Sequence, residues 1–279
     1  MNTSNDILSM EEALSGLLRK YNIREPQDFR LTQPGSSTGL NLLPGWALID
    51  TPFTENHIPL LTWRLKRKFL ELKKIVEDAT IENVCMLRFS SMGNRDEWNW
   101  NSLLYREMDL CEFIGDGEIV SLQAVISDSQ TGNVILRLDN NILCSVEIST
   151  RMPSGSDLTD RHEIIAQRGV ASDLVVDTMI PQNSIYSYTG NGENRYRDID
   201  MELYGFDEEK IDHVRSAFQV LKQPELVQQW QFQHKRLVNF TRSVFISDNE
   251  QRKIKVSRED ILANAPEQED GFLVVPRIL

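Results

Sequence analysis

A change from helical spacing to strict alternation near residue 118 constrains the fold more than any other feature. Three stretches, 118–127, 132–140 and 142–150, alternate apolar and polar residues, and Asn140-Asn141 marks a turn between the last two. The apolar positions are Val120, Leu122, Ala124, Ile126, Val134, Leu136, Leu138, Ile142, Cys144, Val146 and Ile148. Because successive side chains of a strand point to opposite faces, this pattern predicts an antiparallel meander with one buried and one polar face.

The flanking segments predict a mixture of helices and strands. Helical spacing covers 5–20, 57–78, 101–115, 207–222 and 225–247, with a break between the last two at Pro224. Strands are predicted at 45–50, 83–90, 163–168, 173–180, 184–189, 195–203 and 252–256, and residues 24–45 are predicted to form a loop. Residues 45–90 therefore predict one right-handed parallel β-α-β unit.

Together these elements predict the α+β class. We expect a large, mostly antiparallel sheet with helices on one face, preceded by a reduced α/β N-terminal piece. The predicted parts are an N-terminal region at 1–80, a main domain at 81–256, and a C-terminal tail at 257–279 whose start is capped by Ser257.

Charge and cysteine content exclude several classes of function. The net charge of −12 argues against binding to nucleic acid or to an anionic membrane, because both require clustered positive charge. Cys85, Cys111 and Cys144 lack metal-ligand spacing and predict reduced core thiols. Because the sequence shows neither the pattern of a secretory signal nor a long apolar run, we predict a cytoplasmic location.

The sequence contains none of the common motifs for nucleotide binding or for a catalytic serine. The chain contains neither G-x-G-x-x-G nor G-x-x-x-x-G-K-[ST], and it has no G-x-S-x-G. Its four histidines are widely spaced, without the paired spacing of metal ligands. The sequence therefore predicts no catalytic residue, no cofactor and no metal.

The helix at 101–115 carries two charges where core contacts are expected. Its apolar residues span roughly 220° of arc, and Glu107 lies near the middle of that arc with Arg106 beside it. Buried charges need a partner or a wet cavity. Either the two residues belong to a structural ion pair, in which Arg106 can reach Asp109, or they lie at a helix end that emerges into solvent, or this helix borders a ligand cavity.

The order of these segments resembles the second domain of the Gfo/Idh/MocA oxidoreductases. The stretches that carry the resemblance are "REMDLCEFIGDGEIVSLQAVI", "GNVILRLDNNILCSVEIS" and "AFQVLKQPELVQQWQFQHKRLVNFTRSVFISDNEQRKIKV", and together they fall within 81–256. The resemblance implies a helix with an H-x-x-D motif, followed by a large sheet whose open face often makes oligomer contacts.

Departures from the family pattern concern the catalytic parts. The resemblance implies a glycine-rich dinucleotide-binding turn and an E-K-P motif with a catalytic lysine, and this chain has neither. In the H-x-x-D motif Asp109 matches the aspartate, but Arg106 stands in the histidine position. An arginine stays protonated and cannot act as a general base near neutral pH.

The ligand hypothesis therefore assigns binding, and no catalysis, to this region. Arg106 would hold a carboxylate, a phosphate or a sugar hydroxyl through a fork of hydrogen bonds, with Asp109 beside it. Trp98 and Trp100 would form an apolar wall, and His162 would reach the same cavity.

Three functions follow from these observations. The first is a non-catalytic or altered Gfo/Idh/MocA-like protein that binds a small, sugar-like polar molecule or acts as an oligomeric partner subunit. The second is an NAD(P)-dependent oxidoreductase with a divergent or partner-supplied nucleotide site. The third is a structural interaction protein. Self-association is predicted through a polar sheet face that consists of Ser121, Gln123, Arg137, Asp139, Ser145 and Glu147.

Overall fold

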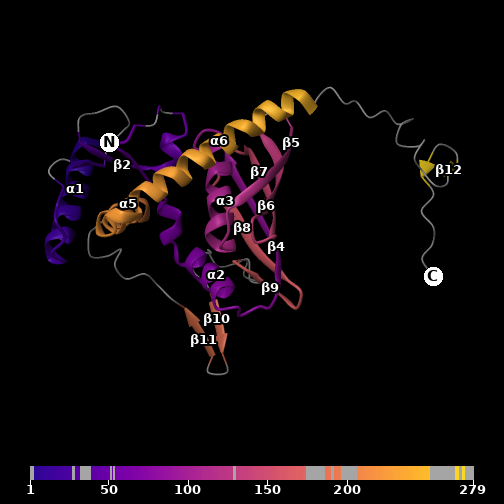
Figure 1. The fold of residues 1–279 in the computed structure, drawn as a ribbon, viewed down its shortest axis with the longest axis horizontal. Helices are drawn as coiled ribbons and strands as arrows, with labels where there is room; N and C mark the ends of the chain where they lie inside the picture. The colour runs from indigo at the N-terminus through magenta and orange to yellow at the C-terminus, as the bar shows by residue number, and fades with distance from the viewer. Residues whose placement is uncertain are drawn as a thin grey trace.

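The fold was obtained as a computed structural model, and it belongs to the predicted α+β class (Figure 1). The structure describes residues 3–26, 29–31, 39–50, 52, 54–127, 130–173, 186–189, 192–195, 206–251, 268–269 and 272–273. Its helices are α1 (Thr3–Lys20), α2 (Arg67–Glu77), α3 (Trp100–Gly115), α5 (Glu208–Lys222) and α6 (Val227–Gln251), with the 3-10 turns η1 (Gly45–Leu48), η2 (Thr62–Leu65) and η3 (Pro224–Leu226).

A six-stranded mixed sheet forms the larger part of the molecule, with the strand order β5-β6-β7-β4-β8-β9. Its strands are β4 (Val84–Asn94), β5 (Ile119–Ser127), β6 (Thr131–Leu138), β7 (Leu143–Met152), β8 (Thr159–Ala166) and β9 (Gly169–Ser172). All neighbours pair antiparallel except β4 and β7, which are parallel. The predicted meander is β5-β6-β7, and the sheet is mostly antiparallel as expected.

One position of the meander differs from the prediction. Leu122, Ala124 and Ile126 face inward as expected, but Val120 is 50% exposed and Ile119 is buried instead. The cause is a register shift between Ile119 and Ser121 in the pairing with β6. A bulge of this kind adds a residue to one strand and therefore exchanges the two faces beyond it.

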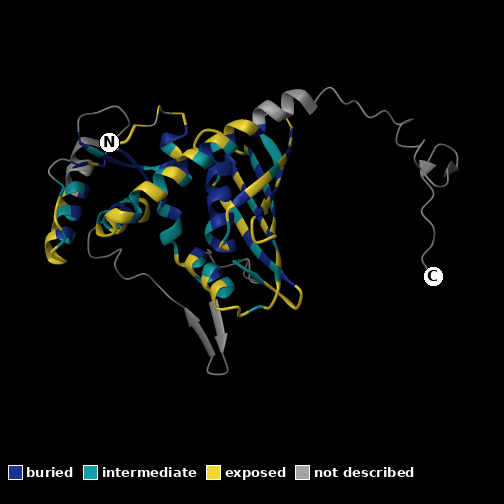
Figure 2. Ribbon diagram, viewed as in Figure 1, coloured by how far each residue is buried: buried dark blue, intermediate teal, exposed yellow. Residues whose placement is uncertain are grey.

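Helices α2, α3 and α6 cover one face of this sheet. The helix α3 packs against β4, β6 and β7, whereas α6 lies over β5 and α2 contacts β9. Every residue of α3 except Asn101 and Phe113 is buried (Figure 2). Asn99 caps the start of the helix, and its side chain accepts a hydrogen bond from the Ser102 amide.

Gly115 ends α3 for reasons of packing. A Cβ atom at this position would lie 2.6 Å from Leu138 Cδ1 and 3.1 Å from Leu87 Cδ1. The left-handed residue that terminates the helix is the next one, Asp116, with φ of 50°. Glycine is therefore required because the helix end approaches the sheet closely.

A smaller parallel sheet lies in the N-terminal part, with the order β1-β2-β3. Its strands are β1 (Phe29–Arg30), β2 (Leu40–Pro44) and β3 (His57–Leu60). A second hydrophobic cluster joins this sheet to α1 and α5, through residues such as Leu14, Leu42 and Val214. The α/β character predicted for the N-terminal piece is therefore present.

Several predictions for residues 24–78 are wrong. Residues 45–50 contain the turn η1 in place of a strand, and the predicted loop contains β1 and β2. The single helix predicted from residue 57 is divided into β3, η2 and α2, because Pro59 lies within a fully buried run that suits a strand. The predicted β-α-β unit is absent, since β3 and β4 belong to different sheets.

Predictions for the remaining segments have mixed outcomes. The helices α5 and α6 and the break at Pro224 agree with the prediction, whereas β8 begins earlier than expected. Cys111 and Cys144 are buried, but Cys85 is exposed and is not a core thiol. The predicted strand at 252–256 and the cap at Ser257 lie outside the described residues, as do most of 173–180 and 195–203.

Short hairpins make up the rest of the described structure. They are β10 (Tyr186–Thr189) with β11 (Gly192–Arg195), and β12 (Gln268–Glu269) with β13 (Phe272–Leu273). Among the described residues, no helix combines the length and the apolar character that a membrane crossing requires.

Candidate functional site

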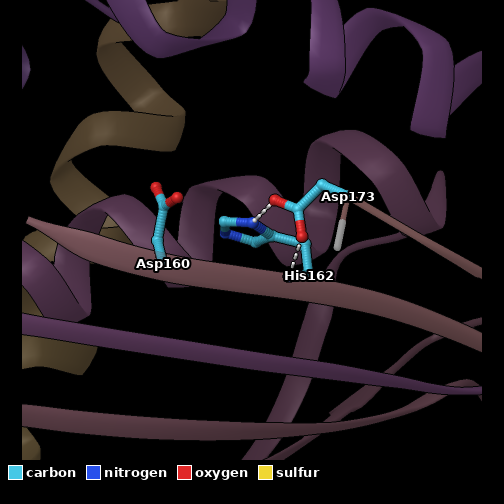
Figure 3. A group of neighbouring side chains, drawn as sticks. All are labelled: Asp160, His162 and Asp173. Atoms are coloured by element: carbon cyan, nitrogen blue, oxygen red, sulfur yellow. Dashed lines mark hydrogen bonds and ion pairs between the residues drawn. The ribbon is translucent and has the colours of Figure 1, made fainter. Parts of the chain in front are cut away.

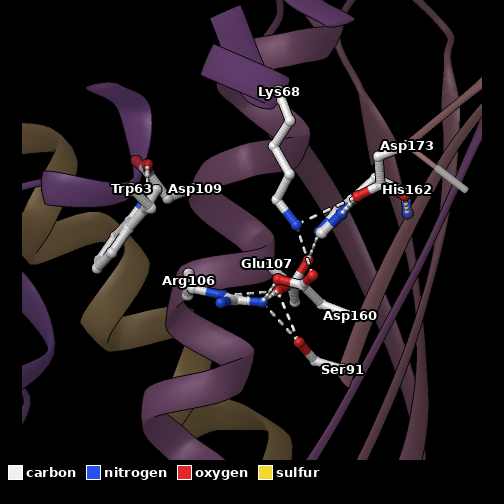
Figure 4. Close-up of polar contacts among 9 residues, drawn as sticks. All are labelled: Trp63, Lys68, Ser91, Arg106, Glu107, Asp109, Asp160, His162 and Asp173. Atoms are coloured by element: carbon white, nitrogen blue, oxygen red, sulfur yellow. Dashed lines mark hydrogen bonds and ion pairs between the residues drawn. The ribbon is translucent and has the colours of Figure 1, made fainter. Parts of the chain in front are cut away.

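The two charges of α3 meet a set of polar residues on the inner face of the sheet (Figure 4). In β4 and β8, Ser91 pairs with Asp160 and Phe89 pairs with His162. Because alternate residues of a strand share a face, Asp160, His162 and Ile164 all turn toward the helices. The sheet therefore presents an acid, an imidazole and a hydroxyl beneath α3.

Arg106 is buried and paired on three sides. Its guanidinium donates to Asp160 Oδ2 at 2.8 Å, to Ser91 Oγ at 2.7 Å and to Glu107 Oε1 at 2.8 Å. Burial would lower the pKa of Arg106, but the two carboxylates raise it above its ordinary value. This geometry agrees with the ion-pair interpretation of the two charges. The partners of Arg106 are Glu107 and Asp160, however, and not the expected Asp109.

His162 lies between two carboxylates. Its Nε2 atom is 3.0 Å from Glu107 Oε2, and its Nδ1 atom is 2.7 Å from Asp173 Oδ2. The rings of Phe69 and Phe89 lie edge-on to the imidazole and shield it from water. Because both ring nitrogens face acceptors, both must donate, which describes an imidazolium ion. Burial would lower the pKa of His162, but Glu107 and Asp173 raise it above its ordinary value.

Lys68 from α2 completes the set, which we call the ionic network. Its ammonium lies 2.5 Å from Asp160 Oδ1 and 3.3 Å from Asp173 Oδ2. The network thus contains three cations and three carboxylates, and its members are Lys68, Arg106, His162, Glu107, Asp160 and Asp173 together with the hydroxyl of Ser91. Balanced pairing of this kind allows charges to remain inside a protein.

Three residues of the network have the atoms of a metal site. The ligand atoms of Asp160, His162 and Asp173 lie within 4.8 Å of one another (Figure 3). However, the Lys68 ammonium contacts both carboxylates, and both nitrogens of His162 already have carboxylate partners. The three residues have the ligand atoms of a metal site. In this geometry, however, the cation that binds the two carboxylates is the ammonium group of Lys68.

Asp109 belongs to a separate cluster on the other side of α3. Arg64 donates to both of its carboxylate oxygens, at 2.6 and 2.9 Å, and Trp63 Nε1 donates at 2.7 Å. The side chain of Asp109 is fully buried. The same side of α3 carries Glu112, which accepts hydrogen bonds from Gln233 and Arg236 of α6.

The structure brings together only part of the predicted ligand site. Arg106 and His162 belong to one network, whereas Asp109 is bound elsewhere. Trp100 is buried in the core against Gly132, and Trp98 packs over Gly93. A ligand-binding role for these five residues stays a prediction, and the contacts described here are those of a packed interior.

The carboxyl ends of the small parallel sheet are covered by the chain itself. In open α/β sheets, nucleotides bind outside the carboxyl ends of the strands. Here η1 follows β2 directly and η2 follows β3. Gly45 of η1 lies so close to α3 that a Cβ atom would be 2.8 Å from the Tyr105 hydroxyl, and Trp63 of η2 contacts Asp109.

Comparison with known proteins yields partial structural similarity alone. No family model matches the chain, and no curated protein matches it. Among solved structures, a probable dehydrogenase from Thermotoga maritima is 17% identical with a TM-score of 0.48, over 70% of this chain and 63% of that chain. The chain therefore spans less than two thirds of the length of that protein.

Two further neighbours are inositol dehydrogenases. The myo-inositol 2-dehydrogenase from Lactobacillus plantarum is 11% identical, with a TM-score of 0.48 over 70% of this chain and 63% of that one. The scyllo-inositol dehydrogenase from Lactobacillus casei, solved with NAD(H) and scyllo-inositol, is 12% identical, with a TM-score of 0.46 over 69% and 63%. Such neighbours are dehydrogenases of the Gfo/Idh/MocA type, the family that the sequence resembles.

Proposed function

We propose that this chain is a non-catalytic or altered protein, similar in fold to Gfo/Idh/MocA oxidoreductases, that binds a small, sugar-like polar molecule or serves as an oligomeric partner subunit. The observation that supports this function is the state of the two positions that match the H-x-x-D motif. Arg106 and Asp109 are both buried; Arg106 donates from Nε and Nη2 to Glu107, Ser91 and Asp160, and both carboxylate oxygens of Asp109 accept hydrogen bonds from Trp63 and Arg64.

A general base must reach the proton that it removes. Arg106 stays protonated, and Asp109 is covered by Trp63 and Arg64. His162 is the histidine of the ionic network and could in principle act as a base. Both of its ring nitrogens are bound to carboxylates, those of Glu107 and Asp173. These contacts support binding or assembly as the function and leave no residue of the motif for proton transfer.

The coverage of the small sheet supports the same proposal. A dinucleotide would need the carboxyl ends of β2 and β3, where η1, η2 and α3 are packed together. The chain also lacks a glycine-rich turn that could bring backbone amides to a pyrophosphate.

Calorimetric titration with NAD+, NADH, NADP+ and NADPH tests the proposal. We expect no heat of binding for any of the four up to about millimolar concentration, a free energy weaker than about −4 kcal/mol. A dissociation constant in the micromolar range would overturn the proposal. It would favour the alternative, an NAD(P)-dependent oxidoreductase with a divergent nucleotide site.

A further inference from the structure

A large groove lies on the N-terminal side of the molecule, away from the ionic network. Its volume is about 1320 Å³. It is bordered by residues 23–26, by the amino ends of β2 and β3, by the end of α5 and by the first turns of α6. No local sequence pattern indicates this groove, because its walls come from four distant segments.

The bottom of the groove is apolar. Leu40 of β2 and Ile58 of β3 lie on the face of the small sheet that α1 and α5 cover, and Val220 and Val227 line the wall. Phe232 of α6 also lines the groove and is 65% exposed. An aromatic ring left open in a concave site is a typical contact for the apolar part of a ligand.

The groove lining carries three basic and two acidic side chains. Arg24, Lys222 and Lys235 line the groove, against the two carboxylates of Glu25 and Glu55. Glu25 already accepts a hydrogen bond from Ser15 at 2.6 Å. Within the described part of the chain, neither Arg24 nor Lys222 forms an ion pair. The lining therefore has a net charge of about +1 from these five side chains, whereas the whole chain has a net charge of −12.

One side chain fixes two walls of the groove to each other. Gln231 of α6 donates from Nε2 to the carbonyl oxygens of Glu55 and His57, at 2.9 and 3.0 Å. These two carbonyls lie at the outer edge of β3, so the amide takes the place of a neighbouring strand there. The groove is therefore formed before any ligand arrives, which reduces the entropy that binding must overcome.

We propose that this groove binds a small molecule with an apolar body and one anionic group, such as a carboxylate. The apolar body would lie on Ile58 and Phe232, and the anionic group would lie at the rim beside Arg24 and Lys222. This inference goes beyond the proposed function, because it names a second site whose ligand is largely apolar, and the two can fail independently.

Octanoate is a suitable probe, because it combines an eight-carbon body with one carboxylate. We expect binding of octanoate by calorimetry, and we expect Lys222→Glu and Phe232→Ala each to weaken it by about fivefold or more, which corresponds to about 1 kcal/mol. The matched controls are Lys20→Glu and Val125→Ala, which change exposed residues outside the groove and should leave the dissociation constant unchanged. Both groove variants should fold, since Lys222 and Phe232 are exposed.

Three results would overturn the inference. The first is no binding of octanoate, and the second is binding that both groove variants retain at full strength. The third is binding of the neutral polyol myo-inositol, lost in the groove variants, without binding of octanoate. That third result would reject the ligand class and leave the proposed function intact, whereas tight binding of NAD(P) would reject the proposed function and not the groove.

Discussion

Arg106 is the residue at which structural and ligand-binding roles can be separated. Its removal would leave the ionic network with two cations for three carboxylates, one of which, Glu107, is fully buried. Breaking a buried ion pair by removing one partner typically costs about 3–5 kcal/mol. We therefore expect Arg106→Ala to lower the free energy of unfolding, measured in denaturant, by an amount of that order.

Arg88→Ala is the matched control for this experiment. Arg88 also pairs with a glutamate, Glu147, but it does so at 3.5 Å on the exposed face of the sheet. Exposed pairs contribute about 0–1 kcal/mol, so this variant should be close to the wild type. Arg106→Ala could instead lower the free energy of unfolding as little as Arg88→Ala does, and at the same time abolish binding of a small polar molecule that the unmodified protein binds. That result would favour the ligand-cavity hypothesis for Arg106 over the ion pair.

His162 makes the stability of the protein depend on pH. Its pKa is raised in the folded state, because attraction to Glu107 and Asp173 outweighs the effect of burial. A group with a raised folded pKa stabilises fully below its unfolded pKa, and that stability is lost as the pH rises through the folded pKa. We therefore expect the free energy of unfolding to fall as the pH increases above 6.5, the ordinary value.

The other groups with shifted pKa values contribute little to the change in stability between pH 6.5 and about 8. The pKa values of His57, His213 and His234 are lowered, chiefly by burial, so their effect lies below pH 6.5 and has the opposite sign. Burial raises the pKa of the Cys111 thiol in the folded protein, so this thiol ionises at a lower pH in the unfolded chain. Its ionisation would also make stability depend on pH, and measurements should therefore stop at about pH 8, before thiols of the unfolded chain ionise. In His162→Gln the decline between pH 6.5 and about 8 should disappear; an unchanged slope would show that His162 does not carry it.

At the scale of elements, α3 illustrates how close packing selects a residue. Gly115→Ala should destabilise the protein by about 1–3 kcal/mol, the usual cost of overpacking, because the new Cβ would meet Leu138 and Leu87. Gly16→Ala is the control, since Gly16 lies within α1 and a Cβ there meets nothing within 4 Å. That change should be neutral or stabilising by up to about 1 kcal/mol. Equal thermal denaturation midpoints for the two variants would contradict the packing argument.

Elements are predictable where their inner positions are apolar. The strands β5, β6 and β7 follow from alternation alone, whereas β8 is predicted too late because two of its inner positions are Asp160 and His162. In the N-terminal part, 45–50 and 57–60 are short apolar runs, and periodicity does not separate a buried turn from a buried strand in such runs.

The ionic network could be predicted only in part. Arg106 and Glu107 are conspicuous because they interrupt an apolar helix face. Their partners Ser91, Asp160 and His162 lie 15 to 55 residues away in the sequence. A pairing between distant segments has no local pattern, so the sequence indicates that a partner is needed without indicating which residue provides it.

At the scale of the whole molecule, no helix of the described residues covers the second face of the large sheet. It carries the predicted polar residues Ser121, Gln123 and Arg137, and Asp139 lies in the turn after β6. The same face also exposes Val125, Ile135 and Leu143, which are 73%, 42% and 42% accessible. This face therefore mixes exposed apolar side chains with polar and charged ones, a composition that a non-obligate interface between proteins can have.

We expect the protein to form an isologous dimer through this face, because two-fold dimers are the commonest assembly and such a face can pair with itself. Light scattering at high micromolar concentration should give about twice the chain mass of 32.2 kDa. Val125→Lys should reduce the measured mass to that of a monomer, since it places a charge at an apolar position of this face that is 73% exposed in the single chain. Leu70→Lys changes an exposed residue of α2 on the opposite, helical side and should leave the dimer intact. A monomeric mass for the unmodified protein would refute self-association, and a dimer that survives Val125→Lys would place the contact on another surface.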